Sequence, residues 1–144
     1  MGFKLERIHI WSGEIADKAG GMSSMLAPLA QAGANLEYIG TRRQPDRPGT
    51  GVIYVAPVTG PAQVRAARLA GLTETHETTV LRVEGDNAAG LGYRLTQQWA
   101  TAGINLQGLT MSVLGSKFVG FAVFDSAIDA NRAAQILADL GSGQ

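Results

Sequence analysis

The chain repeats itself at an offset of 70 positions along its 144 residues. Two Ala-Gly pairs and one Asn-Leu pair recur at this offset: Ala19-Gly20 with Ala89-Gly90, Ala32-Gly33 with Ala102-Gly103, and Asn35-Leu36 with Asn105-Leu106. So much agreement at one offset in a short chain indicates an internal duplication. We therefore expect two similar domains, residues 1–76 and residues 77–144, with no linker between them.

Both copies share one order of predicted elements, which alternating and helical hydrophobic patterns indicate. In the first copy we expect strands at 4–11, 35–43, 51–56 and 73–76, a helix at 20–32, and a second helix between Pro61 and Gly71. In the second copy we expect strands at 78–84, 105–114 and 117–124 and helices at 90–102 and 127–140. The order predicts an α+β fold of two ferredoxin-like βαββαβ units in tandem, each an antiparallel sheet with helices on one face.

The second copy departs from this order at its end. Only four residues follow Leu140, too few for a final strand. We therefore expect the second sheet to lack its last strand and to keep an unpaired edge. Such edges are commonly covered by another chain.

Composition excludes several classes of function. The chain has no cysteine, which rules out disulfide frameworks and cysteine nucleophiles. No apolar run approaches the roughly 20 residues that span a bilayer, and charged residues interrupt the first residues, so we expect a cytoplasmic protein without a signal peptide or membrane contact. Twelve basic residues balance twelve acidic ones, so no nucleic-acid partner is expected.

The zero net charge is unevenly divided. Residues 1–70 carry +3 and residues 71–144 carry −3, which allows the halves to attract each other within or between chains. Residues 117–124 are similar to the RNP1 pattern of RNA-binding domains, but Val119 stands where that pattern has its central aromatic residue. We expect Phe118 or Phe121 to fill the core instead.

No enzyme chemistry is indicated. The two histidines, His9 and His76, fall on predicted strands without a partner motif, and the chain contains neither a nucleophile elbow nor a phosphate-binding P-loop. We expect no catalytic residues, no metal site and no cofactor.

The repeated positions suit ligand binding better. Gly20 and Gly90 begin helices, where free N–H groups and the positive end of the helix dipole favour a carboxylate. Asn87 and Asn105 carry amides that both donate and accept hydrogen bonds. The alternative is structural: Gly33 and Gly103 cap helices, and Asn35 and Asn105 satisfy turns.

An acid or amide, a helix-start glycine and a following Gly-x-Asn-Leu, duplicated within βαββαβ units, resemble the ACT domain family over nearly the whole chain. The family's first loop reads Asp/Asn-Arg-Pro-Gly, of which Asp17 to Gly20 and Asn87 to Gly90 keep only the ends. Asp46-Arg47-Pro48-Gly49 spells that loop but lies between two predicted strands, where a hairpin turn is expected. The resemblance implies these ligand-binding positions: Asp17, Gly20, Asn35, Leu36, Asn87, Ala89, Gly90, Leu91, Asn105 and Leu106.

The resemblance also implies a function. ACT domains bind small molecules, most often amino acids, at interfaces between paired domains, and regulate an attached or associated enzyme. The expectation is a non-catalytic amino-acid sensor that forms a homo-oligomer, most simply a dimer, and controls a metabolic enzyme. The alternative is a structural protein–protein interaction module of the same fold that binds no ligand.

Overall fold

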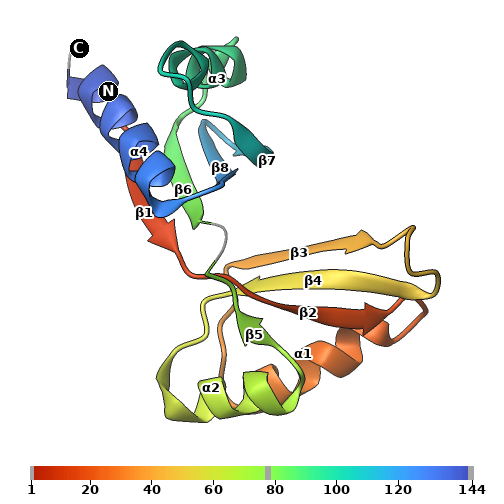
Figure 1. The fold of residues 1–144 in the computed structure, drawn as a ribbon. Coiled ribbons are helices and arrows are strands. Elements are labelled where there is room, and N and C mark those ends of the chain that lie inside the picture. Colours follow the sequence, from red (N-terminus) through yellow and green to blue (C-terminus); the bar gives the residue numbers. More distant parts are fainter. Residues whose placement is uncertain (1, 77–78, 143–144) are drawn as a thin grey trace. The chain divides into compact units, whose positions relative to one another are not determined.

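The computed structural model describes residues 2–76 and 79–142, which form two compact units. The N-terminal unit comprises His9–Thr75, and the C-terminal unit comprises Met1–Ile8 together with His76–Gln144. The expected division into residues 1–76 and 77–144 differs from this grouping in residues 1–8 and in His76, which belong to the C-terminal unit. Figure 1 shows that the chain begins in one unit, builds the other, and then returns.

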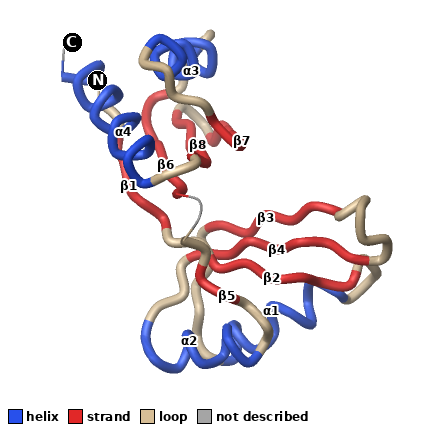
Figure 2. The backbone as a smooth tube through the Cα atoms, viewed as in Figure 1, coloured by secondary structure: helices blue, strands red, loops and turns tan. Residues whose placement is uncertain are grey.

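The N-terminal unit has one antiparallel sheet of four strands in the order β3-β4-β2-β5. Its elements are β2 (Trp11–Ala16), α1 (Gly21–Gln31), β3 (Tyr38–Arg43), β4 (Thr50–Ala56), α2 (Gly60–Leu69) and β5 (Thr73–Glu74). Both helices lie on the same face of the sheet (Figure 2). This is the predicted ferredoxin-like order of elements.

The C-terminal unit repeats that architecture, with a sheet of four strands in the order β1-β6-β8-β7. Its elements are β6 (Thr79–Asp86), α3 (Leu91–Thr101), β7 (Leu106–Leu114), β8 (Lys117–Phe124) and α4 (Ala127–Ser142), completed by β1 (Lys4–Ile8) from the start of the chain. Strand β1 holds the position beside β6 that β5 holds beside β2.

The last strand of the C-terminal sheet comes from the start of the chain, which corrects the expectation that this sheet lacks its last strand. The predicted single strand at 4–11 is two strands, and the break at His9 and Ile10 sends them into different units. Strand β1 pairs antiparallel with β6, from Lys4 opposite Glu84 to Ile8 opposite Val80. The expectation of an unpaired edge beside β6 was therefore wrong, because the N-terminal residues supply the strand that the C-terminus lacks.

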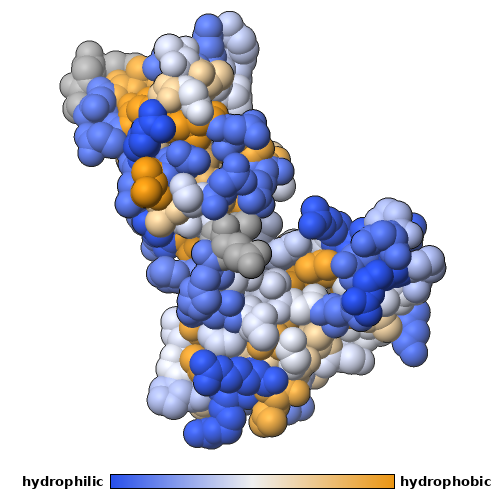
Figure 3. Space-filling view, in the orientation of Figure 1, coloured by the Kyte–Doolittle hydropathy of each residue, from blue (hydrophilic) through white to orange (hydrophobic). Residues whose placement is uncertain are grey.

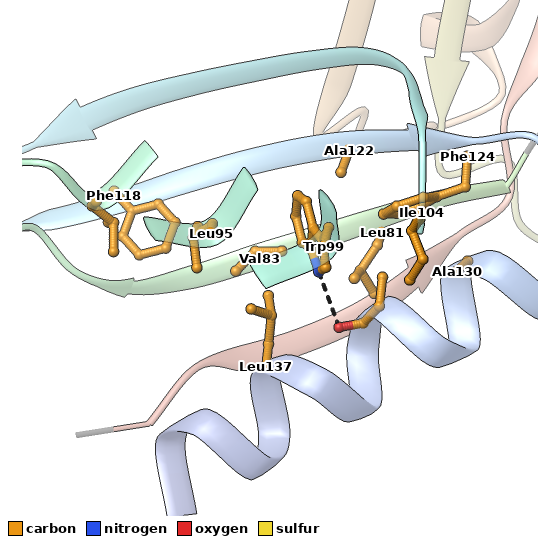
Figure 4. Close-up of a cluster of buried hydrophobic side chains, with 12 residues drawn as sticks. Leu81, Val83, Leu95, Trp99, Ile104, Phe118, Ala122, Phe124, Ala130 and Leu137 are labelled. Carbon is orange, nitrogen blue, oxygen red and sulfur yellow. Dashed lines mark hydrogen bonds between the residues drawn. The ribbon is translucent and has the colours of Figure 1, made fainter. Parts of the chain in front are cut away.

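Each unit has its own hydrophobic core between sheet and helices. In the C-terminal unit Trp99 is 1% exposed, and its indole N–H donates a hydrogen bond of 3.2 Å to the carbonyl oxygen of Ala133 (Figure 4). The Trp99 ring also packs edge-to-face on Phe124. Phe118 is buried in the same core near the other end of β8, which confirms that this phenylalanine fills the core (Figure 4).

Candidate ligand-binding site

The same strand–loop–helix connection recurs in both units, between β2 and α1 and between β6 and α3. Gly20 and Gly90 precede the helices in the left-handed conformation, with φ of 87° and 77°. Residues other than glycine adopt this left-handed backbone conformation only at a cost of about 1 kcal/mol or more. Neither helix start has a side-chain cap. The N–H groups of Gly21 and Leu91 donate to the carbonyl oxygens of Lys18 and Ala88, so the N–H groups of the next two residues of each helix are the ones left for water or a ligand.

A hollow of about 470 Å³ opens at this connection in the N-terminal unit. Its wall includes the loop residues Lys18, Ala19 and Gly20 and the helix residues Gly21 and Ser24. Glu14 of β2 lines another side of it. The hollow therefore offers a cation, a helix N-terminus and a hydroxyl close together, which is a suitable environment for a carboxylate.

Asp17, one of the predicted ligand residues, is paired within the unit. The guanidinium of Arg43 on β3 donates a hydrogen bond of 2.5 Å to the Asp17 carboxylate. The Asp17 backbone N–H donates to the carbonyl oxygen of Gly49 in the β3–β4 turn. The carboxylate is therefore neutralised by an exposed arginine rather than presented to a ligand as an isolated negative charge.

The corresponding hollow in the C-terminal unit holds only about 40 Å³, room for a few water molecules. Gly2 and Phe3 at the start of the chain line it, and so does Leu140 of α4. The Phe3 ring packs edge-to-face on Phe118 with 6.2 Å between ring centroids. The segment that completes the sheet also occupies the space next to the loop.

Charged groups nevertheless lie at this smaller hollow. Asp86 and Arg94 both line it. The Lys117 ammonium donates a hydrogen bond to Asp86 and thereby holds the pKa of that carboxyl below its ordinary value. Arg94 lies one turn into α3, where its backbone N–H donates to the carbonyl oxygen of Gly90.

The predicted asparagines are exposed, but one unit does not bring them together. Asn87 follows β6 at the sheet end marked by Lys117 of β8. Asn105 precedes β7 at the opposite end, which Phe124 of β8 marks. The seven residue steps of β8 between these ends span about 23 Å at about 3.3 Å per residue. Asp17 and Asn35 are separated in the same way by β4, so one small ligand cannot contact both polar groups of a single unit.

The predicted leucines belong to the cores. Leu91 is 4% exposed within the C-terminal core, and Leu106 packs against that core from β7. Leu36 packs against the core of the N-terminal unit. Ala89 lies exposed in the turn before α3. A ligand at these positions would meet backbone rather than leucine side chains.

Sequence reasoning missed the cations at both hollows. Lys18 lies inside the loop that was compared with the family pattern, and Arg94 lies four residues after Gly90. A basic residue within four positions of a helix-start glycine, on either side of it, is the signal that points to them. Tyr93, in the first turn of α3, is 68% exposed and does not line the hollow.

Metal and membrane features are absent from the described parts of the chain. No three histidine, aspartate or glutamate side chains there gather into a group that could hold a metal ion. None of the helices in residues 2–76 and 79–142 is long and apolar enough to cross a membrane.

No protein-family model matches the sequence, and no curated protein matches it either. The fold is shared with solved structures. A protein from Bacteroides thetaiotaomicron superposes with a TM-score of 0.75 at 10% identity over 91% of this chain and 88% of its own. The ligand-free regulatory subunit of aspartate kinase from Thermus thermophilus superposes with a TM-score of 0.65 at 15% identity over 95% of each chain.

A longer protein contains the same fold as a part. Aspartokinase III of E. coli, in complex with aspartate and ADP, superposes with a TM-score of 0.62 at 12% identity over 99% of this chain and 33% of its own. At such identities the likeness shows the fold. This chain is built as two ACT-like ferredoxin units in tandem, the architecture of the aspartate kinase regulatory subunit.

Proposed function

We propose that this chain is a non-catalytic regulatory protein that binds a small molecule, an amino acid, at the loop and helix start that recur in its units. The observation that carries the proposal is the left-handed glycine before an uncapped helix at both connections, with a cation beside it. A carboxylate can accept hydrogen bonds from the free N–H groups and pair with Lys18 or Arg94. The fold shared with a regulatory subunit supports the same role.

The separation of the asparagines suggests where the amino acid lies. Asn87 and Asn105 occupy opposite ends of one sheet, so a ligand that uses both kinds of position needs groups from two units. The proposed ligand position is an interface between two copies of the chain, with the loop of one copy and the strand start of the other around it. Such a ligand favours the assembled state, because only that state completes its binding site.

The partner proposed for this sensor is a metabolic enzyme. If the ligand stabilises the assembly that the partner enzyme recognises, ligand binding raises the affinity for the enzyme by the same coupling free energy. A chain without catalytic groups can regulate an enzyme in this way. The aspartate kinase structures of the same fold make an enzyme of amino-acid metabolism the first candidate to test.

A thermal-shift screen of the purified chain against the twenty amino acids tests the ligand. A ligand at 100 times its dissociation constant adds about 2.7 kcal/mol of stability, which shifts the unfolding temperature measurably. Asn105→Ala removes one hydrogen-bonding group to a charged ligand and should weaken binding about 10–150-fold. Gln98→Ala, an exposed amide on α3, is the matched control and should leave affinity unchanged. Failure of all twenty amino acids at millimolar concentration would refute amino-acid binding.

The second candidate is a protein–protein interaction module that binds no ligand. The small hollow in the C-terminal unit favours it, because Gly2, Phe3 and Leu140 fill the space that a ligand would need. The screen separates the two candidates: an interaction module gives no shift with any amino acid, yet is captured by its partner enzyme.

A further inference from the structure

Corresponding positions beside the two hollows carry side chains of different size. In the N-terminal unit Ile15 of β2 lies opposite Gly51 of β4. In the C-terminal unit the residue of β6 aligned with Ile15 is Gly85, and it lies opposite Phe118 of β8. The large side chain and the glycine have thus exchanged strands. The bare backbone at Gly85 leaves a space on β6 that an isoleucine side chain fills in the other unit.

The ring of Phe3 occupies the space that Gly85 leaves. The ladder between β1 and β6 begins at Lys4 opposite Glu84, so Phe3 comes beside Gly85, one step beyond the ladder. A Cβ atom added at Gly85 would lie 3.2 Å from Cδ1 of Phe3 and 3.1 Å from Cε1 of Phe118. The two phenylalanine rings, which pack edge-to-face, therefore cover the bare backbone of β6.

The residue that corresponds to Phe3 in the N-terminal unit is much smaller. The ladder between β2 and β5 includes Ser12 opposite Thr73, and the same register continued places Ala70 beside Ile15. Ala70 lines the hollow of about 470 Å³, and Phe3 lines the hollow of about 40 Å³. A phenyl ring thus stands in the C-terminal unit where the N-terminal unit has a methyl group.

The surroundings of Phe3 suit a separate molecule that carries an aromatic ring and a carboxylate. Leu91 and Leu95 of α3 and Leu140 of α4 line the hollow together with Phe3. Figure 3 shows hydrophobic residues at the surface of the C-terminal unit between these two helices. Arg94 lines the hollow as well, and its side chain is exposed. Apolar walls with a few charged groups are the usual composition of small-molecule sites.

Phe3 is held by the packing of its ring rather than by the sheet. It precedes the first residue pair of the β1–β6 ladder, its side chain is only half-buried, and Gly2 before it is exposed. Segments that bury few apolar contacts and lie outside the backbone ladder open at a low cost in free energy. The Phe3 ring can therefore leave the hollow while β1 stays paired with β6.

We propose that the C-terminal hollow is a binding site for an aromatic ring, which Phe3 occupies in the free protein and from which a small aromatic carboxylate displaces it. The inference rests on the proposed function, because the carboxylate pairs with Arg94 beside the start of α3. Phe3 is then an internal competitor of the ligand. If its ring fills the hollow for about 90–99% of the time, the ligand binds about 10–100-fold more weakly than to an empty hollow. The C-terminal unit therefore responds only at higher ligand concentrations than the N-terminal unit.

Phe3→Ala tests the competition, with phenylalanine as the probe and alanine as an amino acid that lacks the ring. NMR titration of methyl groups reads the units separately, through Leu95 at the C-terminal hollow and Met25 at the N-terminal one. Phe3→Ala should lower the dissociation constant of phenylalanine at Leu95 about 10–100-fold and leave the value at Met25 unchanged. The dissociation constant of alanine at Leu95 should fall much less, because alanine has no ring to fill the space.

Leu5→Ala is the matched control. Leu5 packs half-buried against the same core from the same segment as Phe3, but the residues that line the hollow do not include it. This variant should leave the affinity at Leu95 unchanged, and circular dichroism should show both variants folded. No gain in Phe3→Ala, an equal gain in Leu5→Ala or an equal gain for alanine would overturn the inference. Binding read at Met25 would persist in each of these cases, so the proposed function and the inference can fail separately.

Fluorine NMR of the parent chain tests the displacement directly. The chain has four phenylalanines, so labelling with 4-fluorophenylalanine gives four signals. The signal of Phe3 is the one that is missing from the spectrum of Phe3→Leu. Excess phenylalanine should move the Phe3 signal toward that of a solvent-exposed ring, while the signal of Phe124, which is 0% exposed, stays in place. A shift of the Leu95 methyl groups without movement of the Phe3 signal would show that the ligand binds beside the ring, which contradicts the inference.

Discussion

Leu5→Ala tests whether the first strand stabilises the C-terminal unit. Leu5 lies opposite Val83 of β6 and packs, half-buried, against the C-terminal core. Complete burial makes a Leu→Ala change cost about 2–5 kcal/mol, so half burial predicts about 1–2.5 kcal/mol. With a urea dependence of about 1.5 kcal/mol per molar, the unfolding midpoint should fall by about 1 M.

The two tryptophans allow the loss to be assigned to a unit. Trp99 lies in the C-terminal core and Trp11 in the N-terminal core, so Trp11→Phe leaves Trp99 as the reporter and Trp99→Phe leaves Trp11. Urea unfolding followed by fluorescence should show the 1 M shift with Trp99 as reporter. Glu6→Ala, on the same strand but with an exposed side chain, is the control and should change little. A shift seen by Trp11 and not by Trp99 would refute the assignment of β1 to the C-terminal unit.

Three further perturbations follow from the contacts. Gly21→Ala places a Cβ 2.0 Å from the carbonyl oxygen of Ala16, so the α1 start must move and thermal unfolding should show a loss of about 1–3 kcal/mol. Leu137→Ala in the C-terminal core, where the side chain is 0% exposed, should cost about 2–5 kcal/mol in urea unfolding. The pKa of Asp86 is held low by a hydrogen bond from Lys117, so its contribution to stability is present above pH about 4 and is lost as the pH falls below. Lys117→Gln should flatten this acid-side decline in the unfolding temperature.

The repeated fold was predictable because its signals are local. Helical spacing, left-handed glycines and hairpin residues act within a few positions, and the glycines predicted to cap the first helix of each copy have φ of 81° and 76° at Gly33 and Gly103. The turn predicted at 46–49 lies between β3 and β4, as expected. Trp99, on the helix after Gly90, fills the C-terminal core and is 1% exposed.

The route of the N-terminal strand was not predictable in the same way. A run such as Lys4 to Trp11 has good strand propensity throughout, and no proline or glycine marks the break at His9 and Ile10. Which sheet a strand joins depends on partners far along the chain, here Glu84 to Val80. The missing strand at the C-terminus was the available signal, because a sheet that lacks an edge strand within its own repeat can take one from another segment.

At the candidate site, too, the features set by neighbouring residues were predictable and those set by distant strand pairing were not. The sequence predicted the helix-start glycines correctly, since a left-handed residue before a helix is a property of a few neighbouring residues. It gave no indication that Asn87 and Asn105 lie at opposite sheet ends, which only the pairing of β6 and β7 with β8 determines. Nor did it indicate that Phe3 narrows the hollow of one unit while that of the other stays open.

The different volumes of the two hollows suggest that the two repeats have different roles. The N-terminal unit keeps an open hollow with Lys18 at the helix start but has arginines on its β3 edge. The C-terminal unit has its hollow narrowed by Gly2 and Phe3 but presents the uncharged β7 edge. After a duplication, either repeat can lose one property if the other keeps it. Ligand binding should therefore depend more strongly on Lys18 than on Arg94. Lys18→Ala should weaken binding in calorimetry while Arg94→Ala has the smaller effect, and the reverse order would show that the narrowed hollow opens to admit the ligand.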